Sequence, residues 1–267
     1  MKAVIMVAGV GSRLSKNVKH LPKCLLAFGG ETILSRNVRL LKEHGIHEIV
    51  VVTGYRAALV KEEIQASATC IVNPFFRVTN SLASLWFADK HTDLYDDLLI
   101  FNGDVVYEEG VLGKALEAPK SPTMLIDTSV IERADYRLKT EDDYVIDQGK
   151  QLSNEDTSGE YVGFAKLSKD FVPVYLSRIR NLVESQEKYG MWWEEALFAI
   201  RDEFRMKVHV TDVRGLFWAE ADYMEDVERI EQWFKQRAAA KPSEHAAAVS
   251  SASAHKPTTL QSKDETL

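Results

Sequence analysis

The chain has 267 residues, of which 45% are hydrophobic and 27% are charged, a composition typical of a globular protein with one large domain. The formal net charge of -7 offers no general attraction to polyanions, so neither nucleic acid nor a membrane surface is an expected partner. No apolar stretch is long enough for a signal-peptide core or a membrane span, which predicts a cytoplasmic protein. Cys24 and Cys70 have no spacing typical of a disulfide framework or a zinc site.

The first half alternates strand-like runs with amphipathic helical segments, a pattern that predicts a Rossmann-like α/β fold with helices on both faces of a mostly parallel sheet. We expect strands at 2–8, 48–53, 69–72 and 97–101, and helices at 32–44, 57–64 and 81–90. Ligands bind outside the carboxyl ends of strands in such sheets. The loops after Ala8, Thr53 and Phe101 should therefore face one crevice.

The pattern changes after Pro122 to shorter, more polar pieces. Strands are expected at 123–127, 137–146 and 161–167, within a small β-rich lid or acceptor-binding region that covers 123–168. Helices at 169–188 and 192–201, strands at 207–210 and 216–219 and a helix at 223–234 then complete a domain of residues 1–235. Residues 236–267 contain almost no large apolar side chains, which predicts a disordered tail.

A glycine-rich segment, Ala8-Gly9-Val10-Gly11-Ser12-Arg13-Leu14, follows the first predicted strand, and Pro22-Lys23 comes soon after it. Glycines let the backbone approach a triphosphate closely, while Arg13 and Lys23 supply positive charge against its oxygens. A Rossmann dinucleotide site would need a third glycine, and a Walker loop would end in Gly-Lys-Ser/Thr, neither of which occurs. The segment therefore predicts an anion-binding loop, with a plain strand-to-helix turn as the alternative.

The loop followed by Pro-Lys resembles the signature of the sugar-phosphate nucleotidyltransferase superfamily, which has the fold of the nucleotide-diphospho-sugar transferases. Three later motifs are also similar, so the resemblance extends over roughly the first 235 residues: Asn102-Gly103-Asp104, Tyr161-Val162-Gly163-Phe164 and Trp218-Ala219-Glu220-Ala221-Asp222. The segments 21–26 and 73–85 look more like the phosphocholine and 2-aminoethylphosphonate cytidylyltransferases than like the hexose-1-phosphate branch.

This resemblance implies a reaction of CTP with a small phosphate or phosphonate acceptor, with release of pyrophosphate. It implies that Asp104, Glu220 and Asp222 hold Mg²⁺, which suits few carboxylates combined with substrate oxygens. Lys23 would act at the α-phosphate and Arg13 at the β- and γ-phosphates, and no general base is needed because the attacking oxygen is already ionised. A turn aspartate and helix capping are the alternatives for the three carboxylates.

Other residues are candidates for binding the two substrates. Besides the loop residues Ala8, Gly9, Gly11 and Ser12, we expect four residues around base and ribose, where ordinary turn and N-cap roles are the alternative: Gly54, Tyr55, Asn80 and Ser84. Lys139 lies in a segment similar to the family's Asp-x-Met-Lys, where the lysine faces the acceptor phosphate, although leucine replaces the methionine here. A solvated lysine is the alternative, and Lys150 has a weaker case.

The segment 189–197 concentrates aromatic residues beside carboxylates. Trp192, Trp193 and Glu194 could hold a cationic acceptor headgroup through an aromatic face and a negative charge. On the predicted helix the two tryptophans would point about 100° apart, so we expect at most one to line the pocket. The alternative is that the tryptophans belong to the core and the glutamates to the helix N-terminus.

Two other functions share most of these features. One is a sugar-1-phosphate uridylyl- or thymidylyltransferase, and the other is a non-catalytic relative that only binds a nucleotide. The residues do not determine the base, the acceptor or the oligomeric state, and a homodimer is possible.

Overall fold

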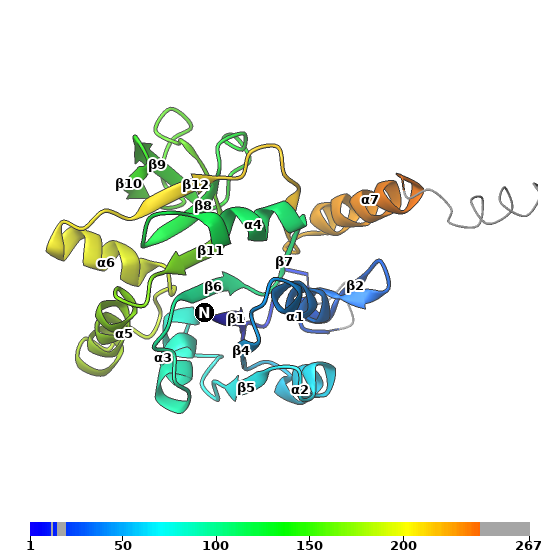
Figure 1. Ribbon diagram of the computed structural model, residues 1–267, viewed down its shortest axis with the longest axis horizontal. Helices are drawn as coiled ribbons and strands as arrows, with labels where there is room; N and C mark the ends of the chain where they lie inside the picture. The colour runs from blue at the N-terminus through cyan, green and yellow to red at the C-terminus, as the bar shows by residue number, and fades with distance from the viewer. Residues whose placement is uncertain (12, 15–19, 241–267) are drawn as a thin grey trace, which may run out of the picture.

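The computed structural model describes residues 1–11, 13–14 and 20–240, and its centre is a nine-stranded sheet (Figure 1). The strand order is β5-β4-β1-β6-β11-β8-β12-β10-β9. The parallel half consists of β5 (Thr69–Val72), β4 (Glu48–Thr53), β1 (Lys2–Val7) and β6 (Leu98–Asn102). This half confirms the predicted α/β fold, and it places the loops after β1, β4 and β6 at one edge of the sheet.

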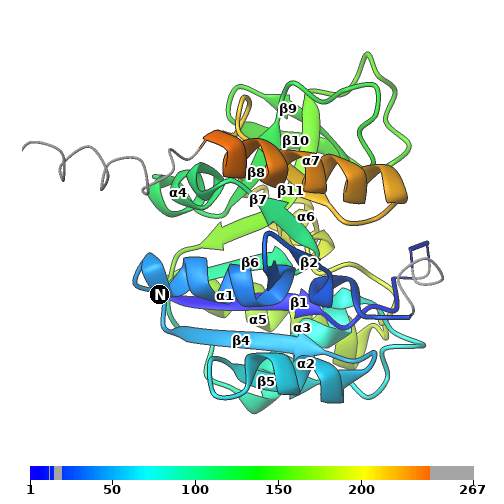
Figure 2. The ribbon, with the colours of Figure 1, turned by 90° about the vertical axis from the view of Figure 1, so that its right-hand side faces the viewer.

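Helices cover both faces of the sheet because successive strand residues point to opposite sides (Figure 2). Val4 and Val52 belong to a core with helices α3 (Ser81–His91), α5 (Val172–Arg180) and α6 (Glu195–Phe204). Ile5 and Val51 belong to the opposite core, with α1 (Ile33–Glu43), α2 (Ala57–Ile64) and α4 (Glu109–Glu117). These strands are buried on both sides, as their continuous apolar sequences predict.

The β-rich region continues the sheet instead of forming a separate layer. Strand β11 (Gly159–Leu167) runs antiparallel to β6 and to β8 (Thr123–Asp127), and β12 (His209–Asp212) runs parallel to β8. The prediction of a single strand at 137–146 is wrong. This segment forms a hairpin of β9 (Arg137–Glu141) and β10 (Tyr144–Gln148), whose turn contains Asp142 at a positive φ of 52°.

Two predicted helices have different bounds in the structure. The first is shorter than 169–188, since α5 is followed by the π-helical segment η2 (Asn181–Ser185). Helix α6 begins at Glu195 instead of 192, because Glu195 accepts a hydrogen bond from the Trp192 N–H at 2.5 Å and Trp193 N–H donates to Ser81 Oγ at 2.9 Å. Trp192 and Trp193 therefore precede the helix, and the helical geometry assumed for them is wrong.

The last described helix, α7 (Met224–Ala240), extends beyond the predicted boundary at residue 235 (Figure 1). It packs beside two small two-stranded sheets. One is formed by β2 (Ala27–Phe28) and β3 (Glu31–Thr32), and the other by β7 (Val105–Tyr107) and β13 (Trp218–Glu220). The rest of the predicted tail, 241–267, lies outside the described residues. Within the described part of the chain, no helix is long and apolar enough to cross a membrane.

Phe234 of α7 stacks on Phe28 with ring centroids 6.2 Å apart, and its ring lies against Gly29. We expect Phe234→Ala to lower the free energy of unfolding by about 2–3 kcal/mol, since a large aromatic contact is lost from a half-buried site. The exposed Gln236→Ala on the same helix should change it by less than about 0.5 kcal/mol. Urea titrations of both variants measure this, and equal effects would show that the Phe234 contact contributes little.

Candidate active site

The site is a cleft of about 280 Å³ at the carboxyl edge of β1 and β6. Its lining comes from both halves of the chain. The first half supplies Met6, Ala8, Gly9, Arg13, Phe76, Thr79, Asn80, Ser81, Ser84, Asn102 and Asp104, and the second supplies Asp135, Tyr136, Lys150, Glu160, Tyr161, Trp192, Glu194, Glu220 and Asp222. A smaller hollow, lined by Gly9, Gly11, Lys23 and Asp104 among others, adjoins it. The two cavities share Met6, Gly9 and Asp104, so they lie side by side.

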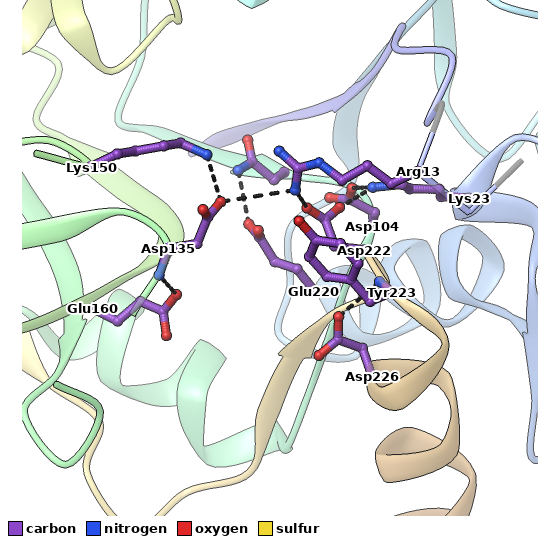
Figure 3. A network of polar contacts seen from close by, with 11 residues as sticks. Arg13, Lys23, Asp104, Asp135, Lys150, Glu160, Glu220, Asp222, Tyr223 and Asp226 are labelled. Carbon is purple, nitrogen blue, oxygen red and sulfur yellow. Dashed lines mark hydrogen bonds and ion pairs between the residues drawn. The ribbon is translucent and has the colours of Figure 1, made fainter. Parts of the chain in front are cut away.

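Lys23 lines the smaller hollow and belongs to the short 3-10 helix η1 (Lys23–Leu25). Gly11 has φ of 62°, and a Cβ on it would come within 2.8 Å of Lys23 Cγ, so the glycine loop can lie against the lysine stem only without a side chain. Lys23 Nζ donates to Asp222 and lies 3.4 Å from Asp104 Oδ2. Arg13 donates to the other oxygen of Asp222, so both predicted cations meet the predicted carboxylates (Figure 3).

Backbone pairing brings these carboxylates together from distant parts of the sequence. Strand β13 pairs with β7 so that Glu220 lies opposite Val105, and the Ala221 N–H donates to the Asp104 carbonyl at 3.0 Å. Asp222 directly follows Ala221, so this backbone hydrogen bond brings it close to Asp104. The Asn102-Gly103-Asp104 segment and the segment 218–222 form a single cluster through this long-range pairing.

The charges in this cluster alter one another's protonation. Burial alone would lower the pKa of Lys23, but the carboxylates of Asp104 and Asp222 outweigh it and raise that pKa. Burial raises the pKa of Asp104, against the opposing effect of Lys23. Burial and then the charges of Asp104 and Asp222 raise the pKa of Glu220 well above its usual range. The carboxylates therefore favour the charged form of Lys23, while burial opposes the charged forms of Asp104 and Glu220.

Asn102 links the cluster to the core, a role that the sequence analysis did not assign. Its Nδ2 donates to Glu220 Oε1 at 3.2 Å, and its Oδ1 accepts from Trp193 Nε1 at 3.1 Å. A Cβ on Gly163, which has φ of 85°, would approach Asn102 Nδ2 within 3.2 Å and Glu220 Oε1 within 3.3 Å. In the sequence, Asn102 and Gly163 could have been found through the Asn-Gly-Asp and Tyr-Val-Gly-Phe motifs, which are similar to those of the family.

Lys139, predicted to face the acceptor phosphate, is on β9 and not among the residues that line the cleft, with Nζ 2.6 Å from Asp156 Oδ1. Lys150 lines the cleft and has Nζ 2.6 Å from Asp135 Oδ2. Figure 3 shows Asp135 between Lys150 and Arg13, whose NH1 lies 4.0 Å away. The sequence pattern could not show which of Lys139 and Lys150 lines the cleft, because that depends on how the β9–β10 hairpin between them folds.

Glu160 holds Asp135 in position, which the sequence analysis also missed. It accepts a hydrogen bond from the Asp135 N–H at 2.8 Å (Figure 3). Burial raises the pKa of Glu160 to about 7. This end of the cleft therefore contains two adjacent carboxyl groups, Asp135 and Glu160, and one lysine, Lys150.

The residues predicted around base and ribose fall into two groups. Asn80 and Ser84 line the cleft, and Asn80 also caps α3 by accepting from the Ser81 N–H at 2.8 Å. Gly54 and Tyr55 are absent from the lining, because the Tyr55 N–H donates to the Ala8 carbonyl and its hydroxyl donates to the His20 carbonyl. Tyr55 therefore supports the glycine loop, and the structure does not bring it or Gly54 to the cleft lining. Ala8 and Gly9 line the cleft, whereas Ser12 lies outside the described residues.

Only one of the two tryptophans lines the cleft. Trp193 is fully buried in the core, and Trp192 lines the opening with its ring 5.5 Å from Tyr136. Lys150 Nζ lies 5.3 Å from the centre of the Trp192 ring. Glu194 is 6% exposed and lines the cleft, and burial raises its pKa to about 8. The aromatic face predicted for a substrate cation is therefore next to a lysine of the protein itself.

Among the described residues, no group of three or more His, Cys, Asp and Glu side chains could hold a metal ion alone. Asp104 and Asp222 share Lys23, while Glu220 bonds Asn102. This donor set fits a hard divalent cation that takes one or two carboxylates and completes its shell with phosphate oxygens and water. It does not fit a cage made of protein alone.

The chain was compared with protein families and with known proteins. Residues 3–135, about half of the chain, match the model of the MobA-like NTP transferase domain. The CTP:phosphoglutamine cytidylyltransferase of Campylobacter jejuni is 26% identical over 250 residues, covering 85% of this chain and 98% of the relative. The CMP-5'-(3-aminopropyl)phosphonate synthase of Streptomyces rubellomurinus is 27% identical and covers 83% of this chain, which spans only 37% of that relative.

Among solved structures, the CTP:phosphocholine cytidylyltransferase of Streptococcus pneumoniae matches with a TM-score of 0.67. The two chains are 20% identical, and the match covers 86% of this chain and 97% of the other. At this identity the likeness shows the nucleotide-diphospho-sugar transferase type of fold. Together with the family match, it shows that this chain belongs to the nucleotidyltransferases with a MobA-like NTP transferase domain.

Proposed function

We propose that this enzyme transfers CMP from CTP to a small phosphate or phosphonate acceptor and releases pyrophosphate. The observation that carries the proposal is the meeting of Arg13 and Lys23 with Asp104 and Asp222 at the glycine loop. Two cations beside a side-chain-free backbone suit a triphosphate, and the carboxylates suit its divalent counter-ion. The names of the Campylobacter and Streptomyces relatives support cytidine as the base and a phosphorylated or phosphonate acceptor.

In this reaction an acceptor oxygen attacks the α-phosphorus of CTP, forming an O–P bond while the bond to the β-phosphate oxygen breaks. Lys23, which is only 14% exposed, would stabilise charge that develops at the α-phosphate, and Arg13 would bind the outgoing pyrophosphate. Both must exchange Asp222 for phosphate oxygens when the nucleotide binds. No general base is required, because the acceptor oxygen is ionised before it attacks.

Mg²⁺ is the proposed cofactor, with Asp104 and Asp222 as ligands and Glu220 close by. A bound Mg²⁺ would neutralise phosphate charge. Burial raises the pKa of Asp104 and of Glu220, and the neighbouring carboxylates add to this effect, so a divalent cation at this place would stabilise their charged forms. Carboxylates engaged by a cation would also leave Lys23 and Arg13 available for the triphosphate.

Lys150 is the proposed partner of the acceptor phosphate or phosphonate, in place of Lys139. It projects from the β10–β11 connection into the end of the cleft opposite Lys23. Its present partner, Asp135, also lies 4.0 Å from Arg13 NH1. An acceptor dianion would replace Asp135 at Lys150 and lie between the nucleotide site and the rings of Tyr136 and Trp192.

The direct test is pyrophosphate release measured with each of CTP, UTP, dTTP, ATP and GTP against phosphocholine, 2-aminoethylphosphonate and glucose-1-phosphate. We expect release with CTP and one of the first two acceptors, with kcat/KM at least about 100-fold above every other nucleotide. Preference for UTP or dTTP with glucose-1-phosphate would instead assign the enzyme to sugar activation. The absence of release in every combination would favour a non-catalytic nucleotide-binding protein.

Replacing Asp104 with asparagine should lower kcat by at least about 1000-fold, a barrier increase of roughly 4 kcal/mol, because it removes a metal-binding charge at nearly constant shape. Mg²⁺-dependent CTP binding, measured by calorimetry, should weaken at least tenfold, while CTP binding in EDTA stays within about twofold. Asp156→Asn, which removes a carboxylate outside the cleft, is the control. Retention of more than about a tenth of the activity would contradict the metal assignment.

Lys150 and Lys139 form a matched pair, because each side chain is about equally exposed, at 39% and 38%, and each lies 2.6 Å from an aspartate. We expect Lys150→Met to lower kcat/KM for the acceptor 10- to 100-fold through the lost charge, with KM for CTP nearly unchanged. Lys139→Met should stay within about twofold of wild type. Steady-state kinetics with each substrate varied in turn measures both variants. A larger loss in Lys139→Met than in Lys150→Met would instead assign the acceptor phosphate to Lys139.

A further inference from the structure

Arg13 meets two consecutive residues of the second half of the chain, Asp222 and Tyr223. Its NH1 donates to Asp222 Oδ2, and its guanidinium carbon lies over the Tyr223 ring, 5.3 Å from the ring centre (Figure 3). A guanidinium over an aromatic ring is attracted by the negative face of that ring. Arg13 is therefore held in two ways, by an ion pair that uses its N–H groups and by a ring that leaves them free.

Tyr223 has a fixed backbone although its side chain is 51% exposed. Its N–H donates to Asp226 Oδ2 at 2.9 Å, and its carbonyl accepts from the Val227 N–H at 3.2 Å, so it is tied to the first turn of α7. Helix α7 packs on β13, the strand that ends at Glu220. A ring that is half exposed contributes little to the core. Its position beside the cleft therefore needs another explanation than packing.

The two contacts of Arg13 respond differently when a nucleotide binds. Under the proposed function, Asp222 would bind the divalent cation and Arg13 would bind the outer phosphates, so the ion pair between them would be given up. The Arg13 side chain is 42% exposed, and a long side chain that loses its partner gains rotamer freedom, which weakens its binding to phosphate. The Tyr223 ring carries no charge and needs none of the N–H groups, so this contact can persist while the guanidinium donates to phosphate oxygens.

Resting on the phosphate-binding role proposed above for Arg13, we infer that Tyr223 is a positioning residue, whose ring keeps Arg13 directed at the β- and γ-phosphates while Asp222 passes to the divalent cation. Tyr223 is not among the residues that line the cleft, so it acts through Arg13 and not through a contact of its own with the nucleotide. Its effect is therefore confined to ligands that carry the outer phosphates.

The test is calorimetric binding, in the presence of Mg²⁺, of CTP and of CMP, which lacks the β- and γ-phosphates. We expect Tyr223→Leu to weaken CTP binding about three- to tenfold, because Arg13 loses the ring, and to leave CMP binding within about twofold. Tyr223→Phe keeps the ring and should stay within about twofold of wild type for both ligands. Tyr95→Leu is the matched control, since Tyr95 is 50% exposed, has Arg180 6.0 Å from its ring centre and is absent from the cleft lining.

The same measurements in an Arg13→Ala background show whether the ring acts through the guanidinium. There Tyr223→Leu should weaken CTP binding no further than about twofold. A three- to tenfold loss in that background, equal losses for CTP and CMP, an equal loss in Tyr223→Phe, or unchanged CTP binding in Tyr223→Leu would overturn the inference and leave the proposed function standing. CTP binding by Arg13→Ala as tight as wild type, or no CTP binding by the wild-type protein, would overturn the proposed role of Arg13 together with the inference.

Discussion

The site depends on one electrostatic constraint, the need of the buried Lys23 ammonium for negative partners. Lys23 lies beneath the glycine loop and finds Asp104 and Asp222 there. A largely buried ammonium without partners would cost several kcal/mol, so these carboxylates are required even in the ligand-free protein. The same carboxylates suit a divalent cation, and the lysine suits a phosphate. In the free protein, the lysine and the two carboxylates of the proposed nucleotide site therefore neutralise one another. When the substrate binds, Lys23 would pair with phosphate and the carboxylates with the divalent cation, so no buried charge would be left unpaired.

Several packing features maintain this arrangement. Gly11 allows the loop to contact the lysine stem, and Gly163 allows β11 to pass beside Glu220. Asn102 ties Glu220 to the indole of the buried Trp193, so the cluster is anchored in the core between the sheet and α6. Helix α7 supports the opposite side by packing on β13, the strand that ends at Glu220. Groups held by such contacts need little reorganisation when charge develops during the reaction.

The two halves of the chain contribute different ends of the cleft. The parallel half supplies the glycine loop, Lys23 and Asp104, which face the proposed triphosphate. The β-rich half and the segment before α6 supply Lys150, Asp135 and Glu194, which face the proposed acceptor. Asp135 bonds Lys150 and approaches Arg13, so it crosses the boundary between the two ends (Figure 3). Under the proposed function, the parallel half would therefore bind the nucleotide and the β-rich half would determine the acceptor.

The sequence alone predicted what depends on local patterns: the parallel strands and their helices, and the glycine loop with Arg13 and Lys23, because apolar periodicity and glycine spacing are local properties. The tertiary structure decided which distant groups meet. Residues 137–148 form a hairpin, so Lys139 lies outside the cleft lining and Lys150, which follows the hairpin, lies in it. Helix α6 begins only at Glu195, and of the two tryptophans before it Trp193 is buried in the core and Trp192 lines the cleft. The roles of Asn102 and Glu160 depend on strand pairings and side-chain hydrogen bonds across 25 or more residues. Such contacts follow from the packing of the whole chain, and no spacing within one segment determines them.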